Sequence, residues 1–445
     1  MLGSTDSKGI SVAVDQNEYL GAGAGTVDAV VTVEASSDLM VTTPPQERVE
    51  ILIIDCSGSM GTGHKFEGAR SATLAALDEV ADGTQFAIVE GTHVARSVFP
   101  TKFPSVRADR RSRAAARRAL NQLRPHGGTA MGTWLGQARQ LATQHPGAMV
   151  HAILLTDGKN EHEEPETLAG EIKLSEGMFT CDCRGVGTDW RVDEVRSISS
   201  ALHGTVDIVK DPANLAADFA AMMQTSMAKG IRELTLRVWT PQGARVQFVK
   251  QVAPTIEDLT GRRAEFGPQV GEYSLGAWGV ENRDYHLQVW VEPAAPGREK
   301  LAARISVLAG EQILGQGLVR ALWTTDTALS ARISRRVAHY TGQAALAQAV
   351  REGLAARKNG DAAIATAKLR RAVELAAESG NEGTAKLLRG VVEVDERTGT
   401  VRLRSHVDAA DEMALDARST KTARIREELP VEAGSTKTAR VWKEM

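Results

Sequence analysis

The sequence predicts an α/β fold in which a doubly wound, mostly parallel sheet is inserted into an antiparallel β-sandwich. Strands and helices alternate over residues 47–230, and short runs of alternating apolar residues return on both sides of that region. Helical periodicity resumes only near residue 326, where a small helical region and then a flexible tail are expected. A chain of 445 residues is long enough for about two to four domains.

Apolar runs separated by helical stretches define the region 47–230. Strands are expected at 49–55, 85–90, 148–156, 178–185 and 205–209, and helices at 65–81, 110–123, 131–143, 163–175, 192–202 and 214–229. Strands that alternate with helices pair in parallel and bury both faces of their sheet. Ligands of such sheets bind beyond the carboxyl ends of the strands.

The segments on either side of this region have strand character. Apolar residues alternate at Ile10, Val12 and Val14, and the same pattern appears at Leu234, Leu236 and Val238 and in later segments. Two N-terminal strands alone would expose their edges and be marginally stable. We therefore expect residues 1–46 to supply the N-terminal strands of a β-sandwich whose remainder is residues 231–325.

The C-terminal part is expected to be smaller and less ordered. Residues 326–390 predict a helical hairpin and residues 391–406 a β-hairpin. From residue 407 apolar residues thin out and charge rises, which predicts a flexible tail over 407–445.

The tail contains the hexapeptide Ser-Thr-Lys-Thr-Ala-Arg twice, at 419–424 and at 435–440. Threonine beside lysine and arginine suits a protein kinase, which makes Thr420, Thr422, Thr436 and Thr438 candidate phosphosites for capture by forkhead-associated (FHA) domains. A solvated tail that arose by duplication, or unphosphorylated contact with a partner, are the alternatives.

Oxygen donors follow two of the buried strands. Asp55, Ser57 and Ser59 come at the end of the run 51–54, Thr129 follows a Gly-Gly pair, and Asp157 follows the run 154–156. Carboxylates and hydroxyls are hard ligands, which suit Mg²⁺ or Mn²⁺ better than zinc or copper. A turn rich in serine and glycine is the simpler interpretation of the first segment alone, but three segments in this order favour a metal site.

These segments resemble the metal-ion-dependent adhesion site (MIDAS) of von Willebrand factor A (VWA) domains, and the five ligand positions match. The resemblance covers about residues 47–230 and implies a Rossmann-like domain in which some ligands bind Mg²⁺ through water. It also implies that a partner protein supplies an Asp or Glu carboxylate to the ion. In its order of segments the chain is similar to bacterial cytosolic VWA proteins, which implies serine/threonine kinases, phosphatases and FHA proteins as partners.

The sequence thus predicts a non-catalytic, metal-dependent protein-binding scaffold in phosphorylation signalling. One alternative is an adaptor for an AAA+ ATPase of the MoxR type, and another is a metal-dependent hydrolase. The phosphate-binding pattern Gly-x-x-x-x-Gly-Lys-Ser/Thr does not occur, so ATPase activity would come from another chain. Ser57 and Ser59 do not match the Gly-x-Ser-x-Gly nucleophile elbow.

Composition and charge limit the classes of partner and the cellular compartment that we expect. The net charge of −3 gives no reason to expect nucleic acid or membrane attraction. An arginine-rich stretch at 107–118 reads as a solvated helix, because stacking aromatics do not interleave it. The chain has three cysteines, no N-terminal apolar run and no apolar stretch long enough to span a bilayer. We therefore expect a cytoplasmic protein.

Overall fold

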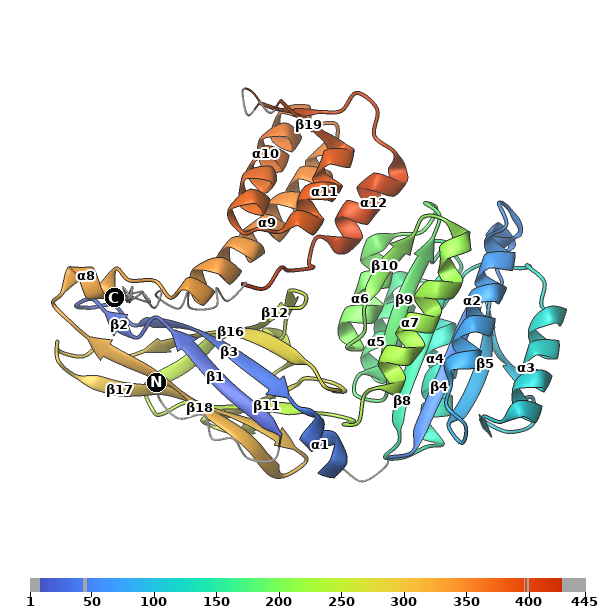
Figure 1. The fold of residues 1–445 in the computed structure, drawn as a ribbon, viewed down its shortest axis with the longest axis horizontal. Coiled ribbons are helices and arrows are strands. Elements are labelled where there is room, and N and C mark those ends of the chain that lie inside the picture. The colour runs from blue at the N-terminus through green and yellow to red at the C-terminus, as the bar shows by residue number, and fades with distance from the viewer. Residues whose placement is uncertain (1–8, 43–45, 396, 398–399, 426–445) are drawn as a thin grey trace, which may run out of the picture.

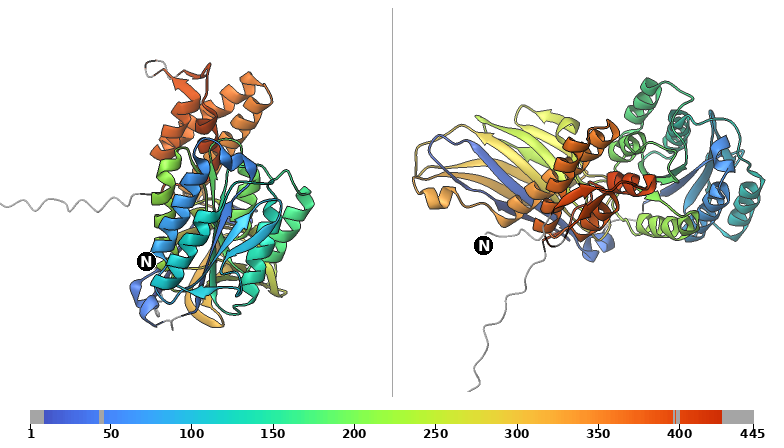
Figure 2. Two further views of the ribbon diagram at one scale, coloured as in Figure 1. Left: turned by 90° about the vertical axis from the view of Figure 1, so that its right-hand side faces the viewer. Right: turned by 90° about the horizontal axis from the view of Figure 1, so that it is seen from above.

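The computed structural model describes residues 9–42, 46–395, 397 and 400–425. Three parts are visible in Figure 1: a β-sandwich, an α/β domain beside it, and a helical region above the junction of the two. Seen from above, the helical region again lies over that junction (Figure 2). The predicted fold class, a doubly wound α/β domain inserted in a sandwich, is confirmed.

The inserted domain is built on a sheet with the strand order β10-β9-β8-β4-β5-β6. Its parallel strands are β4 (Arg48–Asp55), β5 (Gln85–Gly91), β8 (Met149–Thr156), β9 (Thr180–Val186) and β10 (Val206–Val209). Two short strands, β6 (Ala95–Phe99) and β7 (Val106–Arg107), pair antiparallel with β5. Because β4 is central and carries the apolar run 51–54, it is buried on both faces.

Helices cover both faces of this sheet. One core joins it to α2 (Lys65–Glu79), α3 (Arg110–Gln122) and α7 (Leu215–Met227). A second core on the opposite face joins it to α4 (Met131–Thr143), α5 (Pro165–Ser175) and α6 (Val192–Ala201). Two 3-10 turns, η1 (Gly58–Gly61) and η2 (Pro212–Asn214), precede α2 and α7.

The sandwich combines segments from both sides of the insertion. One sheet has the order β1-β3-β16-β12-β13 and the other β14-β15-β11-β17-β18-β2. The first sheet is formed by β1 (Ile10–Gln16), β3 (Thr26–Ala35), β16 (Asn282–Val291), β12 (Ala244–Ala253) and β13 (Glu257–Asp258). The second is formed by β14 (Ala264–Gly267), β15 (Val270–Ser274), β11 (Thr235–Trp239), β17 (Glu299–Ala309), β18 (Gln312–Trp323) and β2 (Tyr19–Leu20).

Pairing of β3 with β16 joins the N-terminal strands to the later ones across 256 positions of sequence, from Val30 to His286. The edge strand β2 runs parallel to β18, so the second sheet is not wholly antiparallel. Short helices flank the sandwich, namely α1 (Ser37–Thr42), the 3-10 turn η3 (Thr260–Arg262) and α8 (Thr327–Ser330).

The C-terminal region differs from the expected hairpin and tail. Three helices, α9 (Arg335–Lys358), α10 (Ala362–Glu378) and α11 (Glu382–Val391), pack together where two were predicted. The hairpin of β19 (Val392–Val394) and β20 (Val401–Leu403) follows them. The last element is α12 (Ala409–Arg418), whose Leu415 packs into the core of the helical region.

The prediction of a flexible tail beginning at residue 407 is therefore wrong for its first part. Asp408 caps α12 by accepting a hydrogen bond from Ala410 N at 2.8 Å, and Ala414, Leu415 and Ala417 are buried. Small residues such as alanine contribute little to apolar periodicity, so the periodicity of the sequence did not indicate a helix here. Residues 426–445 of the predicted tail, which include the second hexapeptide, lie outside the described residues.

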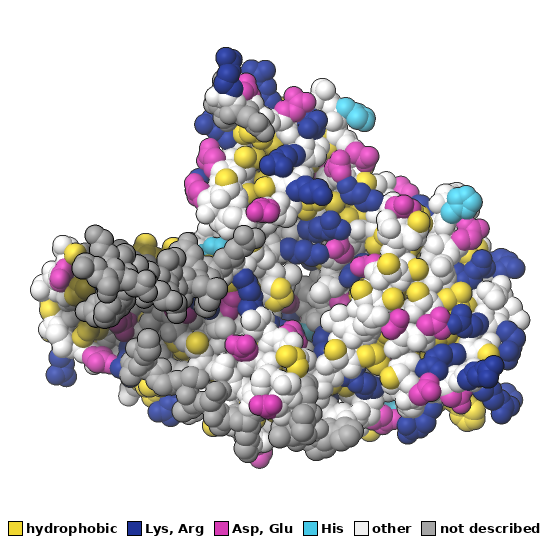
Figure 3. All heavy atoms as spheres, in the orientation of Figure 1, with side chains coloured by type: hydrophobic (Ala, Val, Ile, Leu, Met, Phe, Trp, Pro, Cys, Tyr) yellow, Lys and Arg dark blue, Asp and Glu magenta, His cyan; other side chains and the backbone are white. Residues whose placement is uncertain are grey.

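The arginine-rich helix α3 forms part of the basic surface at the right-hand edge of Figure 3. Ala116 and Leu120 face the core, while Arg113 pairs with Asp82 at 2.6 Å and Arg117 pairs with Asp78. The helix is thus an ion-paired surface element. Among the described residues, no helix combines the length and the apolar character needed to cross a bilayer.

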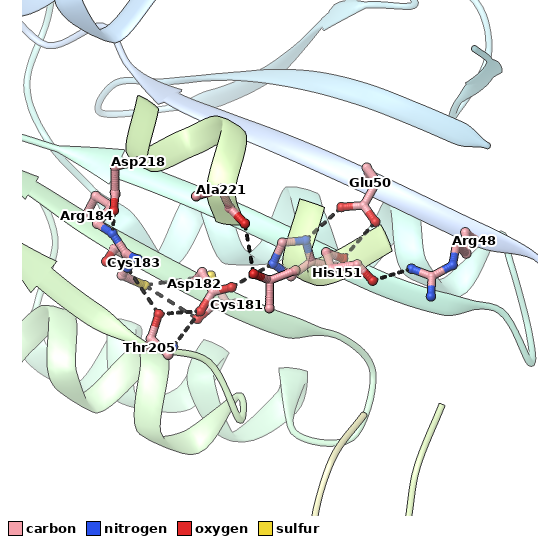
Figure 4. A network of polar contacts seen from close by, with 12 residues as sticks. Arg48, Glu50, His151, Cys181, Asp182, Cys183, Arg184, Thr205, Asp218 and Ala221 are labelled. Carbon is pink, nitrogen blue, oxygen red and sulfur yellow. Dashed lines mark hydrogen bonds and ion pairs between the residues drawn. The ribbon is translucent and has the colours of Figure 1, made fainter. Parts of the chain in front are cut away.

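A buried charged network links three strands of the inserted domain near their amino ends (Figure 4). His151 on β8 places Nδ1 2.7 Å from Oε2 of Glu50 on β4, and Nε2 3.0 Å from Oδ2 of Asp182 on β9. Burial lowers the pKa of His151, but the two carboxylates outweigh burial and raise it to about 9. Both ring nitrogens therefore donate, and His151 is an imidazolium at neutral pH.

We expect this network to make the stability of the protein depend on pH. The pKa of His151 is about 9 in the folded state against 6.5 ordinarily, so the stabilisation is complete below pH 6.5 and disappears as pH rises through about 9. Wild-type protein should lose roughly 3 kcal/mol of unfolding free energy over that range.

The measurement is urea unfolding from pH 6 to pH 10, with His151→Gln as the comparison. The variant should be destabilised at pH 6 by roughly 3–5 kcal/mol, because the buried carboxylate of Glu50 and the partly buried carboxylate of Asp182 lose their cation. It should also lack the fall in stability between pH 6.5 and pH 9. Parallel pH profiles for the two proteins would contradict the assignment.

Candidate metal centre

Two carboxylates meet at one edge of the inserted sheet. Asp55 is the last residue of β4, and Asp157 directly follows β8. These strands are adjacent and parallel, with Ile54 opposite Leu155, so both chains deliver their carboxylate at the same end. Both side chains are fully buried. The sequence prediction that Asp55 and Asp157 lie at the carboxyl edge of a parallel sheet agrees with this placement.

Asp55 is held by hydrogen bonds on both carboxylate oxygens. Ser57 N donates to Oδ1 at 2.7 Å, and Thr156 Oγ1 donates to Oδ2 at 2.7 Å. Burial raises the pKa of Asp55 to about 6, although hydrogen bonds from Ser57 and Thr156 lower it and the nearby charge of Asp157 raises it further. A carboxylate in such surroundings is stabilised by a cation placed beside it.

The hydroxyls of the first motif connect the two carboxylates. Ser57 Oγ lies 3.0 Å from Ser59 Oγ, and Ser59 Oγ donates to Asp157 Oδ1 at 2.7 Å. The 3-10 turn η1 begins at Gly58, between the two serines whose hydroxyls lie together. Three of the predicted donors, Asp55, Ser57 and Ser59, are therefore joined to Asp157 through short contacts.

Thr129 reaches the same place from a glycine loop. Gly127 has φ +69, which favours glycine, and its carbonyl accepts from Gly58 N at 3.0 Å. A Cβ on Gly158 would lie 2.9 Å from Thr129 Oγ1 and 3.6 Å from Ser59 Oγ. Gly158 thus leaves room for the threonine hydroxyl beside the residues that follow β8.

The three hydroxyl residues line a pocket of about 270 Å³ that opens to solvent, together with Gly58, Gly127, Gly128, Gly158, Lys159, Glu161, His162 and Asp189. Asp55 and Asp157 lie behind this lining and are hydrogen-bonded to it. The structure thus brings together Asp55, Ser57, Ser59, Thr129 and Asp157. Two carboxylates and three hydroxyls are the oxygen donors that Mg²⁺ prefers, so the donor set fits that ion.

Two residues that the sequence did not indicate support the site. Lys65, the first residue of α2, places Nζ 2.8 Å from Asp157 Oδ2 and 3.0 Å from Asp189 Oδ2. Thr156 fixes Asp55, as described above. Lys65 stands six positions after Ser59 in the sequence, but its partners Asp157 and Asp189 are about a hundred residues away, so the sequence did not show this pairing.

The acidic stretch after Asp157 serves two purposes. Glu161 and His162 line the pocket, and His162 Nδ1 accepts from Thr129 N at 3.2 Å. Asn160 Oδ1 and Glu163 Oε1 accept from Met131 N at 2.7 Å and Gly132 N at 2.6 Å. These two side chains cap the start of α4 and so hold the loop that carries Thr129.

Known proteins resemble both the inserted domain and the C-terminal region. The family model of the von Willebrand factor type A domain matches residues 51–220, and that of the von Willebrand factor type A C-terminal domain matches residues 374–419. The solved structure of von Willebrand factor type A from Catenulispora acidiphila is 49% identical in sequence. It covers 96% of this chain and 99% of its own, with a TM-score of 0.90.

Two further relatives are more distant. The ArnB paralog VWA2 from Sulfolobus acidocaldarius is 12% identical, covers 92% of this chain and 97% of its own, and has a TM-score of 0.56, which shows a likeness of fold alone. An uncharacterized protein from Synechocystis is 28% identical over 219 residues, so the match spans 47% of this chain and 49% of that protein. Because the Catenulispora relative is similar over nearly its whole length, the chain belongs to the von Willebrand factor type A family.

Proposed function

We propose that the protein is a scaffold that binds a partner protein through a divalent ion held by Asp55, Ser57, Ser59, Thr129 and Asp157. Domains of this family are generally metal-dependent protein-interaction modules and are mostly non-catalytic. The observation that carries the proposal is the convergence of two buried carboxylates and three hydroxyls on one open pocket. Mg²⁺ is the proposed ion, and Mn²⁺ has the same ligand preferences.

The charges around the pocket support docking of a partner carboxylate. Lys65 neutralises part of the negative charge of Asp157, so a bound ion would keep enough positive charge to attract an anionic side chain. An Asp or Glu from a partner would complete its coordination. Glu161 and Asp189 on the rim disfavour a strongly acidic segment, so the proposed partner presents one carboxylate flanked by neutral or basic residues.

Phosphorylation signalling remains the proposed setting, with a serine/threonine kinase, a phosphatase and FHA proteins as partners and the cytoplasm as the compartment. Thr436 and Thr438 lie outside the described residues. Thr420 and Thr422 belong to a docked segment, and Thr422 Oγ1 donates to Val252 O at 2.7 Å. A kinase would have to release this segment before it could modify Thr422.

Removing the charge of Asp55 should abolish metal binding without unfolding the domain. In Asp55→Asn the amide oxygen still accepts from Ser57 N and the amide nitrogen can donate to the Thr156 hydroxyl, and a buried amide costs less than a buried carboxylate. We expect Mg²⁺ affinity, measured by isothermal titration calorimetry, to fall at least about 100-fold, because even groups that only support ligands change affinity roughly 10- to 100-fold. Asp78→Asn, which alters a half-exposed carboxylate at the far end of α2, is the matched control. Unchanged affinity in Asp55→Asn would refute the site.

Lys65→Met should bind Mg²⁺ more tightly than the wild type. The ammonium bonds Asp157 and repels a cation placed there, and two unit charges about 4 Å apart interact by about 4 kcal/mol near a protein surface. Because the lysine can also turn to Asp189, we expect only part of that energy, an increase of about tenfold. Lys65→Arg keeps the charge and should stay near wild type. Weaker binding in Lys65→Met would show that the lysine supports the ion.

Partner capture should depend on the ion. Immobilised full-length protein should retain its partners with Mg²⁺ and release them with chelator, and Asp55→Asn should retain none. Kinase, phosphatase or FHA proteins in the eluate support the signalling setting, whereas a MoxR-type ATPase identifies an adaptor. Turnover of a phosphoester by the purified chain would reveal a hydrolase. Capture that survives both chelator and Asp55→Asn contradicts docking through metal.

A further inference from the structure

The first hexapeptide, residues 419–424, runs through the junction of the three parts of the molecule. It follows α12, passes between the helical region and the sandwich, and touches the inserted domain through Asp207 on β10 (Figure 1). Although the sequence predicts it to be part of a flexible tail, Ser419 is buried and each of the five residues that follow makes a polar contact.

Main-chain contacts hold the segment like an added strand. Thr420 O accepts from Ile256 N at 2.8 Å, and Thr422 N donates to Pro254 O at 3.0 Å. From the helical region, Asn381 Nδ2 lies 3.2 Å from Lys421 O and His339 Nε2 lies 2.7 Å from Ala423 O. These contacts fix the path of the backbone but accept many sequences.

Side-chain contacts select the sequence. Lys421 Nζ lies 2.7 Å from Asp207 Oδ2, and Arg424 Nη2 donates to Asn282 O at 2.5 Å. Thr422 Oγ1 donates to Val252 O at 2.7 Å and lies 3.1 Å from Pro254 O. Separate groups of the junction therefore contact Lys421, Thr422 and Arg424.

The second hexapeptide carries the same three residues in the same order, as Lys437, Thr438 and Arg440. The likeness extends beyond the six identical positions. Both copies have alanine two positions before the hexapeptide, an aliphatic residue (Ile425 or Val441) directly after it, and glutamate four positions after its arginine. Each side chain that the junction reads in the first copy is thus present in the second.

We propose that the junction is a recognition site for Ser-Thr-Lys-Thr-Ala-Arg, and that residues 435–440 can occupy it in place of residues 419–424. The site comprises Asp207, Val252, Pro254, Ile256, Asn282, His339 and Asn381. The chain has one such site for two copies of its ligand, so one copy is always free for another protein. Exchange of the copies changes which stretch of the tail is exposed.

The exchange leaves α12 in place. Arg418, the last residue of α12, donates from Nε to Asp207 Oδ1 at 2.7 Å, and that contact precedes the hexapeptide. When the second copy is bound, residues 419–434 would form a loop. The entropic cost of closing that loop makes occupancy of the site by the first copy roughly one to two orders of magnitude more favourable than occupancy by the second. An open groove of about 1290 Å³, lined by the docked segment and by α9 and the α10–α11 turn, gives a peptide access from solvent.

The rate of hydrogen exchange at the Ile256 amide reports whether a hexapeptide occupies the site in the full-length protein, because that amide donates to the docked segment. The first-copy variant combines Lys421→Glu with Thr422→Val, and the second-copy variant combines Lys437→Glu with Thr438→Val. We expect the second-copy variant to match wild type and the first-copy variant to exchange about 10- to 100-fold faster. The variant with all four substitutions should lose protection of Ile256, while amides of β4 and β8 stay protected in every protein.

A first-copy variant that exchanges Ile256 as fast as the fourfold variant would overturn the proposal. In the first-copy variant, the hydrogen-exchange protection of Ile256 should not depend on protein concentration. Protection that rises with concentration would show that the second copy comes from another molecule, and would overturn replacement within one chain. As an independent measurement, a fluorescent Ser-Thr-Lys-Thr-Ala-Arg peptide should bind the fourfold variant at least tenfold more tightly than wild type, whose site is filled. A peptide with glutamate in place of lysine should not bind, and equal binding of the two peptides would also overturn the proposal.

Discussion

Parallel pairing of β4 with β8 is the constraint on which the rest of this molecule depends. The pairing aligns Ile54 with Leu155 and so brings the next residues, Asp55 and Asp157, to one edge of the sheet. Two carboxylates in one buried place repel each other, and the burial and mutual charge that raise the pKa of Asp55 measure that cost. Hydroxyls, the ammonium of Lys65 and a bound cation are the means by which such an edge is stabilised.

Burial of charge also organises the other end of the same strands. His151, Glu50 and Asp182 satisfy one another in the interior of the sheet, where an unpaired member would be costly. At neutral pH the imidazolium of His151 balances part of the carboxylate charge at that end. At the edge where we propose the metal site, part of that neutralisation would fall to an exchangeable ion, so that end of the sheet would serve binding while the other end serves stability.

Insertion into the sandwich attaches the binding domain at both of its ends. The sandwich is closed by β3 pairing with β16, so its two halves come from either side of the insertion and both connections to the inserted domain start from ordered strands. The C-terminal segment adds a second attachment, since α12 and the first hexapeptide contact Asp207 of the inserted domain as well as the sandwich.

Local pattern was sufficient for much of this description. The alternation of strands and helices, the position of the insertion and the placement of Asp55 and Asp157 follow from periodicity and from strand ends, because parallel strands share one carboxyl edge whatever their partners are. The full set of five oxygen donors rested in addition on the resemblance to the VWA metal site. Only the tertiary structure assigned Lys65 to Asp157, Thr156 to Asp55 and the first hexapeptide to the junction. These contacts depend on side chains that fold together from positions about a hundred or more residues apart, and neither periodicity nor composition records which distant groups will meet.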